Sequence, residues 1–134
     1  MSPSAIDRLV TSRIYKTKWF DRFARKERIE GTVLREAITR AERGQVDADL
    51  GGSVIKQRVA RTGQGRSGGY RTLVLLRVGE RAIFAYGFAK SDRGNVRDNE
   101  LMALRELATE LLDYDDEELT QALRAGAPIE VKDE

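Results

Sequence analysis

Residues 54–88 hold three successive segments with the composition of β-strands, and this restricts the fold more than any other feature. Residues 54–60 alternate and are rich in β-branched side chains, while residues 70–78 and 81–88 are apolar and aromatic. Residues 61–69 contain four glycines and no apolar side chain, which predicts a loop. Gly79 leads the two-residue connection Gly79-Glu80, which is typical of a type II′ hairpin. We expect three consecutive antiparallel strands, with 70–76 central because it is apolar on both faces.

Helical patterns surround this segment. After a short alternating strand at residues 13–16, Thr17 is a candidate N-cap for a first helix, and Gly31 separates it from a second helix that ends at Gly44. Leucines at helical spacing over 101–112 predict a third helix with Asp98 as its cap. Residues 116–125 are expected to form a short fourth helix. Asp115 and Glu118 have the spacing of a capping box for this last helix, which ends at Gly126. The order β-α-α-β-β-β-α-α predicts an α+β fold. We expect a single domain over residues 1–134, with an acidic helical extension from about residue 113 to 134.

Two missing residue types limit the chemistry. The chain has no cysteine, so disulfides, thiolate nucleophiles and Cys-based metal sites are excluded. It has no histidine either, which excludes His metal ligands and ordinary His acid–base catalysis. The proton transfers of an enzyme of this composition must use Lys, Tyr, carboxylates or the substrate itself, and no cofactor or metal is expected. No apolar run is long enough to cross a bilayer, and residues 1–10 lack an apolar signal core, so we expect a cytoplasmic protein without a membrane partner.

The net charge of +2 hides an uneven distribution along the chain. Residues 52–97 hold ten Lys/Arg against two Asp/Glu, whereas residues 98–134 hold three against twelve. A basic middle segment predicts a surface that binds a polyanion. The simpler alternative is a solvated surface followed by an acidic tail, and the carboxylates at 113–118 are equally typical of a helix N-terminus.

The basic residues of the middle segment fall at particular positions of the expected strands. Lys56 and Arg58 project to one side of their strand, because alternate residues share a face. Arg71 shares a face with Leu73 and Leu75, and Lys90 closes the third strand on a face with Phe84, Tyr86 and Phe88. We expect helices to cover one face of the sheet and the bare face to carry these basic side chains. Arg61 and Arg66 belong to the expected loop.

Several short motifs in this order resemble toxins of the RelE superfamily, and their HigB-like branch most closely. The motifs are Lys-Gln-Arg at 56–58, Arg61, Ser-Gly-Gly-Tyr-Arg at 67–71 and Tyr-Gly-Phe-Ala-Lys at 86–90. The resemblance covers nearly the whole chain, and its most specific parts are Gly-Gly-Tyr-Arg and the terminal Ala-Lys. It implies a RelE-like fold, with a small antiparallel sheet packed on the N-terminal helices.

The resemblance also implies a metal-independent endoribonuclease that cuts mRNA on the ribosome and is silenced by an antitoxin protein. In the implied reaction the ribose 2′-hydroxyl attacks the adjacent phosphorus. Arg71 is then expected to contact the scissile phosphate, Lys56 to act as base and Arg58 to stabilise the transition state, with Lys90 supporting the phosphate. Neighbouring positive charge disfavours the protonated form of a lysine, which suits its use as a base. The side chains expected to hold the RNA backbone are Arg61, Arg66 and Arg93.

Some residues depart from the family pattern, and other functions remain open. Ser91 stands where RelE-type enzymes often have an arginine, and Tyr114 is the only tyrosine near the C-terminus, so the general acid is unassigned. Tyr70 alternates to the face opposite Arg71 and is expected to pack, whereas Tyr86 fits either role. The alternatives are a ParE-type toxin acting on DNA gyrase, a non-catalytic RNA- or ribosome-binding module, and an inactive relative.

Overall fold

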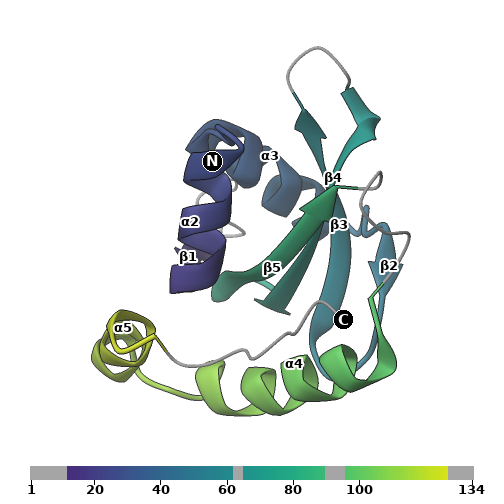
Figure 1. Cartoon of the computed structure of the whole chain (residues 1–134). Coiled ribbons are helices and arrows are strands. Elements are labelled where there is room, and N and C mark those ends of the chain that lie inside the picture. The colour runs from purple at the N-terminus through teal and green to yellow at the C-terminus, as the bar shows by residue number, and fades with distance from the viewer. Residues whose placement is uncertain (1–11, 62–64, 90–95, 127–134) are drawn as a thin grey trace, which may run out of the picture.

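The middle of the chain forms a five-stranded sheet in the order β1-β5-β4-β3-β2 (Figure 1). The computed structural model describes residues 12–61, 65–89 and 96–126, except for the side chains of 65–68. The long antiparallel part of the sheet consists of β3 (Val54–Arg61), β4 (Gly65–Arg77) and β5 (Arg81–Ala89), with β4 between the other two. The predicted triple of antiparallel strands and its central member are therefore confirmed. β1 (Arg13–Lys16) adds parallel to β5, and the two-residue β2 (Ala48–Asp49), which was not predicted, adds antiparallel to β3.

Two N-terminal helices cover one face of the sheet. They are α2 (Lys18–Lys26) and α3 (Gly31–Glu42), and Figure 1 shows them on the same side. Phe20 and Ile38 are fully buried between these helices and the sheet. The predicted packing of the sheet on the N-terminal helices is confirmed. Their apolar partners on the strands are Ile55, Val59, Val74, Ala82 and Phe84.

The opposite face is not bare. α4 (Asp98–Leu111) packs across its end next to the β4–β5 turn, and α5 (Asp116–Arg124) follows at the side (Figure 1). Leu104 and Leu111 of α4 share a buried cluster with Leu75 of the sheet. The expectation that helices cover only one face was therefore wrong, because the leucine stripe of α4 needs an apolar surface and finds it there. The fold remains the predicted α+β order with β2 added. None of the described helices has the length and apolar character needed to cross a membrane.

The helix ends mostly follow the predicted signals. The Thr17 hydroxyl accepts a hydrogen bond from the Phe20 amide at 3.1 Å, and the Asp115 and Glu118 side chains form a reciprocal capping box. Gly44 and Gly126 end their helices with positive φ angles of 83° and 74°. The predicted Asp98 cap was wrong, because the chain enters α4 one residue earlier, at Arg97.

Three details of the strands differ from the prediction. Gly79 (φ 79°) is the third residue of a turn closed by a hydrogen bond from Glu80 N to the Arg77 carbonyl at 3.0 Å. A positive φ at this position is what a type II turn requires. Because Arg77 pairs with Arg81, the connection between the two strands is three residues long. The expected two-residue turn is therefore not formed. The expected loop at 61–69 is shorter, since Arg61 already pairs with Gly65 and the hairpin strands continue.

The third difference is a bulge in β5 that changes which residues share a face. Leu73 pairs with Tyr86, but the next residue, Val74, pairs with Phe84. The extra residue turns Phe84 toward α2 and α3, while Tyr86 and Phe88 face the α4 side. The prediction that all three aromatic residues share one face was therefore wrong.

Candidate functional site

Strand pairing brings three predicted basic residues together on the face that α4 partly covers. Arg58 of β3 lies directly opposite Arg71 of β4, and Lys56 lies opposite Leu73. Residues that pair across antiparallel strands project to the same face, with Cβ atoms about 4.5–5.5 Å apart. Lys56, Arg58 and Arg71 therefore lie on this face between the end that α4 covers and the β3–β4 hairpin. We call these three residues the basic cluster.

Arg71 is the most unusual member of the basic cluster. Only 6% of its surface is exposed, and its buried Nη1 atom has no hydrogen-bond partner among the residues that the structure describes. A buried cation is normally paired, because moving it out of water without compensation is expensive. Its cross-strand neighbours are Arg58 on β3, which is another cation, and the buried aromatic residue Phe88 on β5. This arrangement favours binding of an anion, since an anion would supply the missing acceptor and offset the repulsion between the two guanidinium groups.

The backbone of Arg58 is held by residues that sequence analysis did not select. The Arg58 amide donates to Asp47 Oδ2 at 2.5 Å, and Arg40 Nη2 donates to the Arg58 carbonyl at 2.6 Å. Arg40 also pairs with Asp47 (3.8 Å), which closes a small network along the outer side of β3. These contacts come from α3 and the connection before β2, so they fix the strand that carries Lys56 and Arg58.

Gln57, which lies between Lys56 and Arg58 in the sequence, also helps to hold β3 in place. Its side chain is fully buried on the opposite face and donates to the carbonyls of Ala37 and Gln45 at 2.9 and 3.1 Å. Its Oε1 accepts from the Asp47 amide at 3.0 Å. A polar residue at an inward position of a strand was the available signal for this role.

Arg61 lies away from the basic cluster. Its guanidinium lies over the Tyr70 ring at 5.3 Å, on the face covered by α2 and α3. Tyr70 is buried, donates to Glu27 Oε1 at 2.7 Å and contacts Phe23 edge-on, so the expectation that it packs is confirmed. Arg61, Glu27 and Tyr70 line a hollow of about 210 Å³ between the hairpin and the α2–α3 connection.

The remaining predicted residues differ in how far the structure describes them. Lys90, Arg93 and the side chain of Arg66 lie outside the described residues. Tyr86 is buried with its ring 4.2 Å from that of Trp19, which places it in the core.

Tyr114 belongs to the α4–α5 corner. Its hydroxyl donates to Glu110 and its carbonyl accepts from Arg81 Nη1 at 2.6 Å. Arg81 pairs with Arg77, and Arg71 lies six residues further along β4, which is about 20 Å at the usual strand rise. Tyr114 is therefore remote from the basic cluster.

A comparison with known families agrees with this arrangement. The family model described as "RelE toxin of RelE / RelB toxin-antitoxin system" matches residues 12–131. The chain belongs to the RelE toxin family. The match runs from β1 past the end of α5, so the RelE region includes the whole sheet, the basic cluster and the acidic helix α5. Among curated proteins none shows significant similarity to this RelE-family chain.

Proposed function

We propose that this RelE-family chain is an endoribonuclease of the HigB-like branch that cleaves mRNA on the ribosome and is silenced by an antitoxin. The observation that carries the proposal is Arg71, a buried guanidinium beside Arg58 whose Nη1 atom finds no partner within the described part of the chain. An RNA phosphate is an anion of matching geometry, because its oxygens accept the two parallel N–H bonds of a guanidinium.

The proposed reaction uses the cluster as follows. The 2′-hydroxyl of the RNA attacks the neighbouring phosphorus, the new 2′-O–P bond forms and the P–O5′ bond breaks. Lys56 takes the 2′-hydroxyl proton as base, Arg71 and Arg58 stabilise the charge on the phosphate oxygens, and the departing 5′-oxygen gains a proton. Lys90 is proposed to support the phosphate, and Arg61, Arg66 and Arg93 to hold the RNA backbone, Arg61 from the other face of the hairpin.

The test is induced expression in a bacterial host, with growth and mRNA 5′ ends followed together. Wild type is compared with Arg71→Ala and with Arg71→Lys, which keeps the charge but loses the planar fork. Arg35→Ala is the matched control, because Arg35 is exposed on α3 and belongs to the opposite side of the sheet. Growth arrest with new mRNA ends is expected for wild type and the control, and a loss of about 100-fold or more in cleavage for both Arg71 variants.

The other outcomes separate the competing functions. Arrest without new mRNA ends would indicate a different target, and a DNA supercoiling assay would then test gyrase. Arrest that survives in Arg71→Ala would remove Arg71 from the active site. No arrest at verified soluble expression would contradict the toxin activity itself. Purified protein assayed on translating ribosomes and on free mRNA then tests ribosome dependence.

A further inference from the structure

A hollow of about 210 Å³ lies at the base of the β3–β4 hairpin, on the face opposite the basic cluster. The connection between α2 and α3 forms one wall, and Ala60 and Arg61 of β3 with Tyr70 of β4 form the other. We call it the hairpin hollow. Its volume is below the range of typical ligand pockets, about 300–1,000 Å³. The hairpin hollow therefore suits a single flat ring system whose substituents stay outside.

Arg61 offers a stacking surface in the hairpin hollow. Its guanidinium carbon lies 5.3 Å from the centre of the Tyr70 ring, which is a cation–π arrangement. Tyr70 is itself fixed, because it is buried and its hydroxyl donates to Glu27 Oε1 at 2.7 Å. The ring thus holds one side of the guanidinium. The side that is turned away from the ring can receive a nucleobase, which is a group that stacks on arginine planes.

Glu27 supplies a hydrogen-bond acceptor for the edge of such a base. A carboxylate has about four lone-pair positions, and the Tyr70 hydroxyl uses one of them. No ion pair found among the described residues involves Glu27. Guanine is the RNA base whose Watson–Crick edge carries two adjacent donors, N1–H and the N2 amino group, and these match the two oxygens of one carboxylate.

Arg28 occupies a backbone position that favours glycine. It follows the last residue of α2 with a φ angle of 56°, and the next amide, of Ile29, donates back to the Ala24 carbonyl at 2.8 Å. Glycine is usual at this position of a helix end, because a Cβ atom is strained at positive φ. A side chain that is kept in a strained conformation points to a function. Arg28 is exposed and lines the hairpin hollow, where it can meet the phosphate of a nucleotide whose base lies inside.

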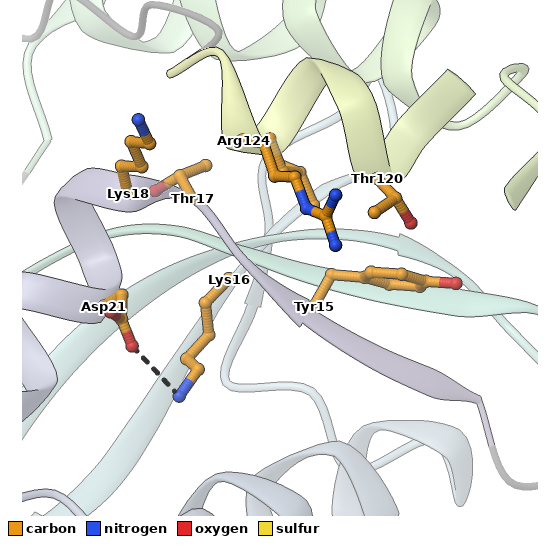
Figure 2. A pocket seen from close by; sticks show the side chains of 8 residues that line it. Tyr15, Lys16, Thr17, Lys18, Asp21, Thr120 and Arg124 are labelled. Carbon is orange, nitrogen blue, oxygen red and sulfur yellow. Dashed lines mark ion pairs between the residues drawn. The ribbon is translucent and has the colours of Figure 1, made fainter. Parts of the chain in front are cut away.

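The larger hollow between β1 and α5, of about 310 Å³, is built differently (Figure 2). Its carboxylate, Asp21, is already ion-paired with Lys16 at 3.3 Å, and Figure 2 shows the two side chains pointing toward each other. Arg124 of α5 lines this hollow and is exposed, like Arg28. Arg124 therefore provides a matched control position.

We propose that the hairpin hollow binds a guanine base, stacked on Arg61 and held at its Watson–Crick edge by Glu27, with Arg28 on the attached phosphate. The base belongs either to a free guanine nucleotide or to an RNA strand. Only the RNA source rests on the proposed function. Arg58 and Arg61 are three residues apart on β3, about 10 Å, so one RNA strand can contact both the basic cluster and the hairpin hollow.

The experiment is an NMR titration of the full chain with guanosine 5′-monophosphate, and adenosine 5′-monophosphate is the matched probe. The guanine nucleotide is expected to bind about tenfold more tightly, with shifts at Arg61 and Tyr70. Glu27→Gln keeps an acceptor for the Tyr70 hydroxyl but replaces one carboxylate oxygen with a donor, so it should abolish the preference for guanine.

The Arg28 variant separates binding from folding. Arg28→Gly should weaken binding of the guanine nucleotide about fivefold, because it removes a charge-assisted contact to the phosphate. It should not lower the melting temperature, since the released strain offsets the extra freedom of glycine in the unfolded chain. Arg124→Ala removes an arginine from the other hollow and should bind the nucleotide as wild type does.

A uridine hexamer with one central guanosine distinguishes the two sources of the base. It is 2′-O-methylated throughout, which removes the hydroxyl needed for cleavage. If the base comes from RNA, this hexamer should bind about tenfold or more tightly than the free nucleotide and lose that gain in Arg71→Ala. If the base comes from a free nucleotide, the hexamer should bind no more tightly than the nucleotide itself.

Four results would overturn the proposal: no binding at millimolar guanosine 5′-monophosphate, equal binding of the adenine nucleotide, unchanged binding in Arg28→Gly or Glu27→Gln, and shifts that map to the basic cluster or to the hollow beside Arg124. Failure of the proposed function is seen separately. Absence of mRNA cleavage by wild type would contradict the ribonuclease and leave the nucleotide titration standing.

Discussion

Arg58 and Arg71 pair across β3 and β4, yet Arg58 is exposed and Arg71 is only 6% exposed. The buried Nη1 atom of Arg71 has no hydrogen-bond partner in residues 12–61, 65–89 and 96–126. Like charges opposite each other on a sheet are destabilising, and desolvation adds to that cost for the buried member. The two arginines therefore contribute differently to the stability of the folded chain.

We expect Arg71→Met to raise the free energy of unfolding by about 1–3 kcal/mol, because it removes a buried cation and keeps an unbranched side chain of similar length. Arg58→Met should change stability by less than about 0.5 kcal/mol, since its side chain is in water. Urea denaturation of both variants measures this. A destabilised Arg71→Met would mean that the guanidinium is already well compensated in the folded state.

Arg81 joins the β4–β5 turn to the α4–α5 corner. Its side chain, 11% exposed, donates to the carbonyls of Leu111 and Tyr114 and to Asp116 Oδ1, at 3.1, 2.6 and 3.0 Å. Arg81→Met removes this donor from the Leu111 and Tyr114 carbonyls, while Asp116 keeps Arg13 and Tyr15 as partners. The substitution should lower the free energy of unfolding by about 2–3 kcal/mol. Arg35→Met, at an exposed position of α3, is the control. Equal denaturation midpoints for the two variants would contradict this role.

Gly52 and Gly79 form a matched pair for separating backbone strain from steric contact. Both have positive φ angles, 60° and 79°, but a Cβ atom on Gly52 would lie 2.7 Å from Cγ of Arg105, whereas nothing lies within 4 Å at Gly79. Gly79→Ala should therefore cost only the backbone strain, about 1–2 kcal/mol. Gly52→Ala should cost more, because Arg105 must also move away from the Leu50 carbonyl that it contacts. Thermal unfolding of both variants tests the order, and equal losses would mean that Arg105 moves freely.

Tyr114 should ionise at higher pH than an ordinary tyrosine. The hydrogen bond to Glu110 raises the pKa of the Tyr114 hydroxyl, and desolvation and the Glu110 and Glu118 charges raise it further. Because the pKa is raised in the folded state, the associated stability is complete below the ordinary tyrosine pKa of 10.0 and is lost as the pH rises through the higher folded value. The ultraviolet titration of wild type minus that of Tyr114→Phe isolates this group. Glu110→Gln should move its midpoint down, and an unchanged midpoint would count against the hydrogen bond.

Local patterns predicted most of the elements of this fold. The caps at Thr17 and Asp115 and the glycines after α3 and α5 depend on neighbours only a few residues away, and they were found correctly. The bulge between Tyr86 and Phe84 was not predictable in this way, because an extra residue in one strand is defined only by its partner strand. The α4 packing depends likewise on an apolar patch formed by distant strands.

The candidate site was likewise predictable only where it depends on local sequence. Alternation along strands placed Lys56 and Arg58 on one side, and the register of β3 with β4 then brings Arg71 to them. The burial of Arg71 and the support of Arg58 by Arg40 and Asp47 involve three different parts of the chain, and no local pattern encodes them. The roles of the basic residues in catalysis remain predictions.

The separation of charge in the fold gives the molecule a permanent electric dipole along the sheet. Residues 98–126 hold nine Asp/Glu and two Lys/Arg, and α4 and α5 lie at the lower end in Figure 1. β3 and β4 together hold six Lys/Arg and no acidic residue. Arg77 lies at the α4–α5 end, next to Asp113, and the other five follow the strands toward the hairpin at the opposite end. Near a highly charged polyanion, the electric field turns such a protein so that its positively charged end faces the polyanion before contact. Collisions are then biased toward the hairpin end, so charged residues that never touch a ligand still affect how often an encounter is productive, and added salt should remove this bias.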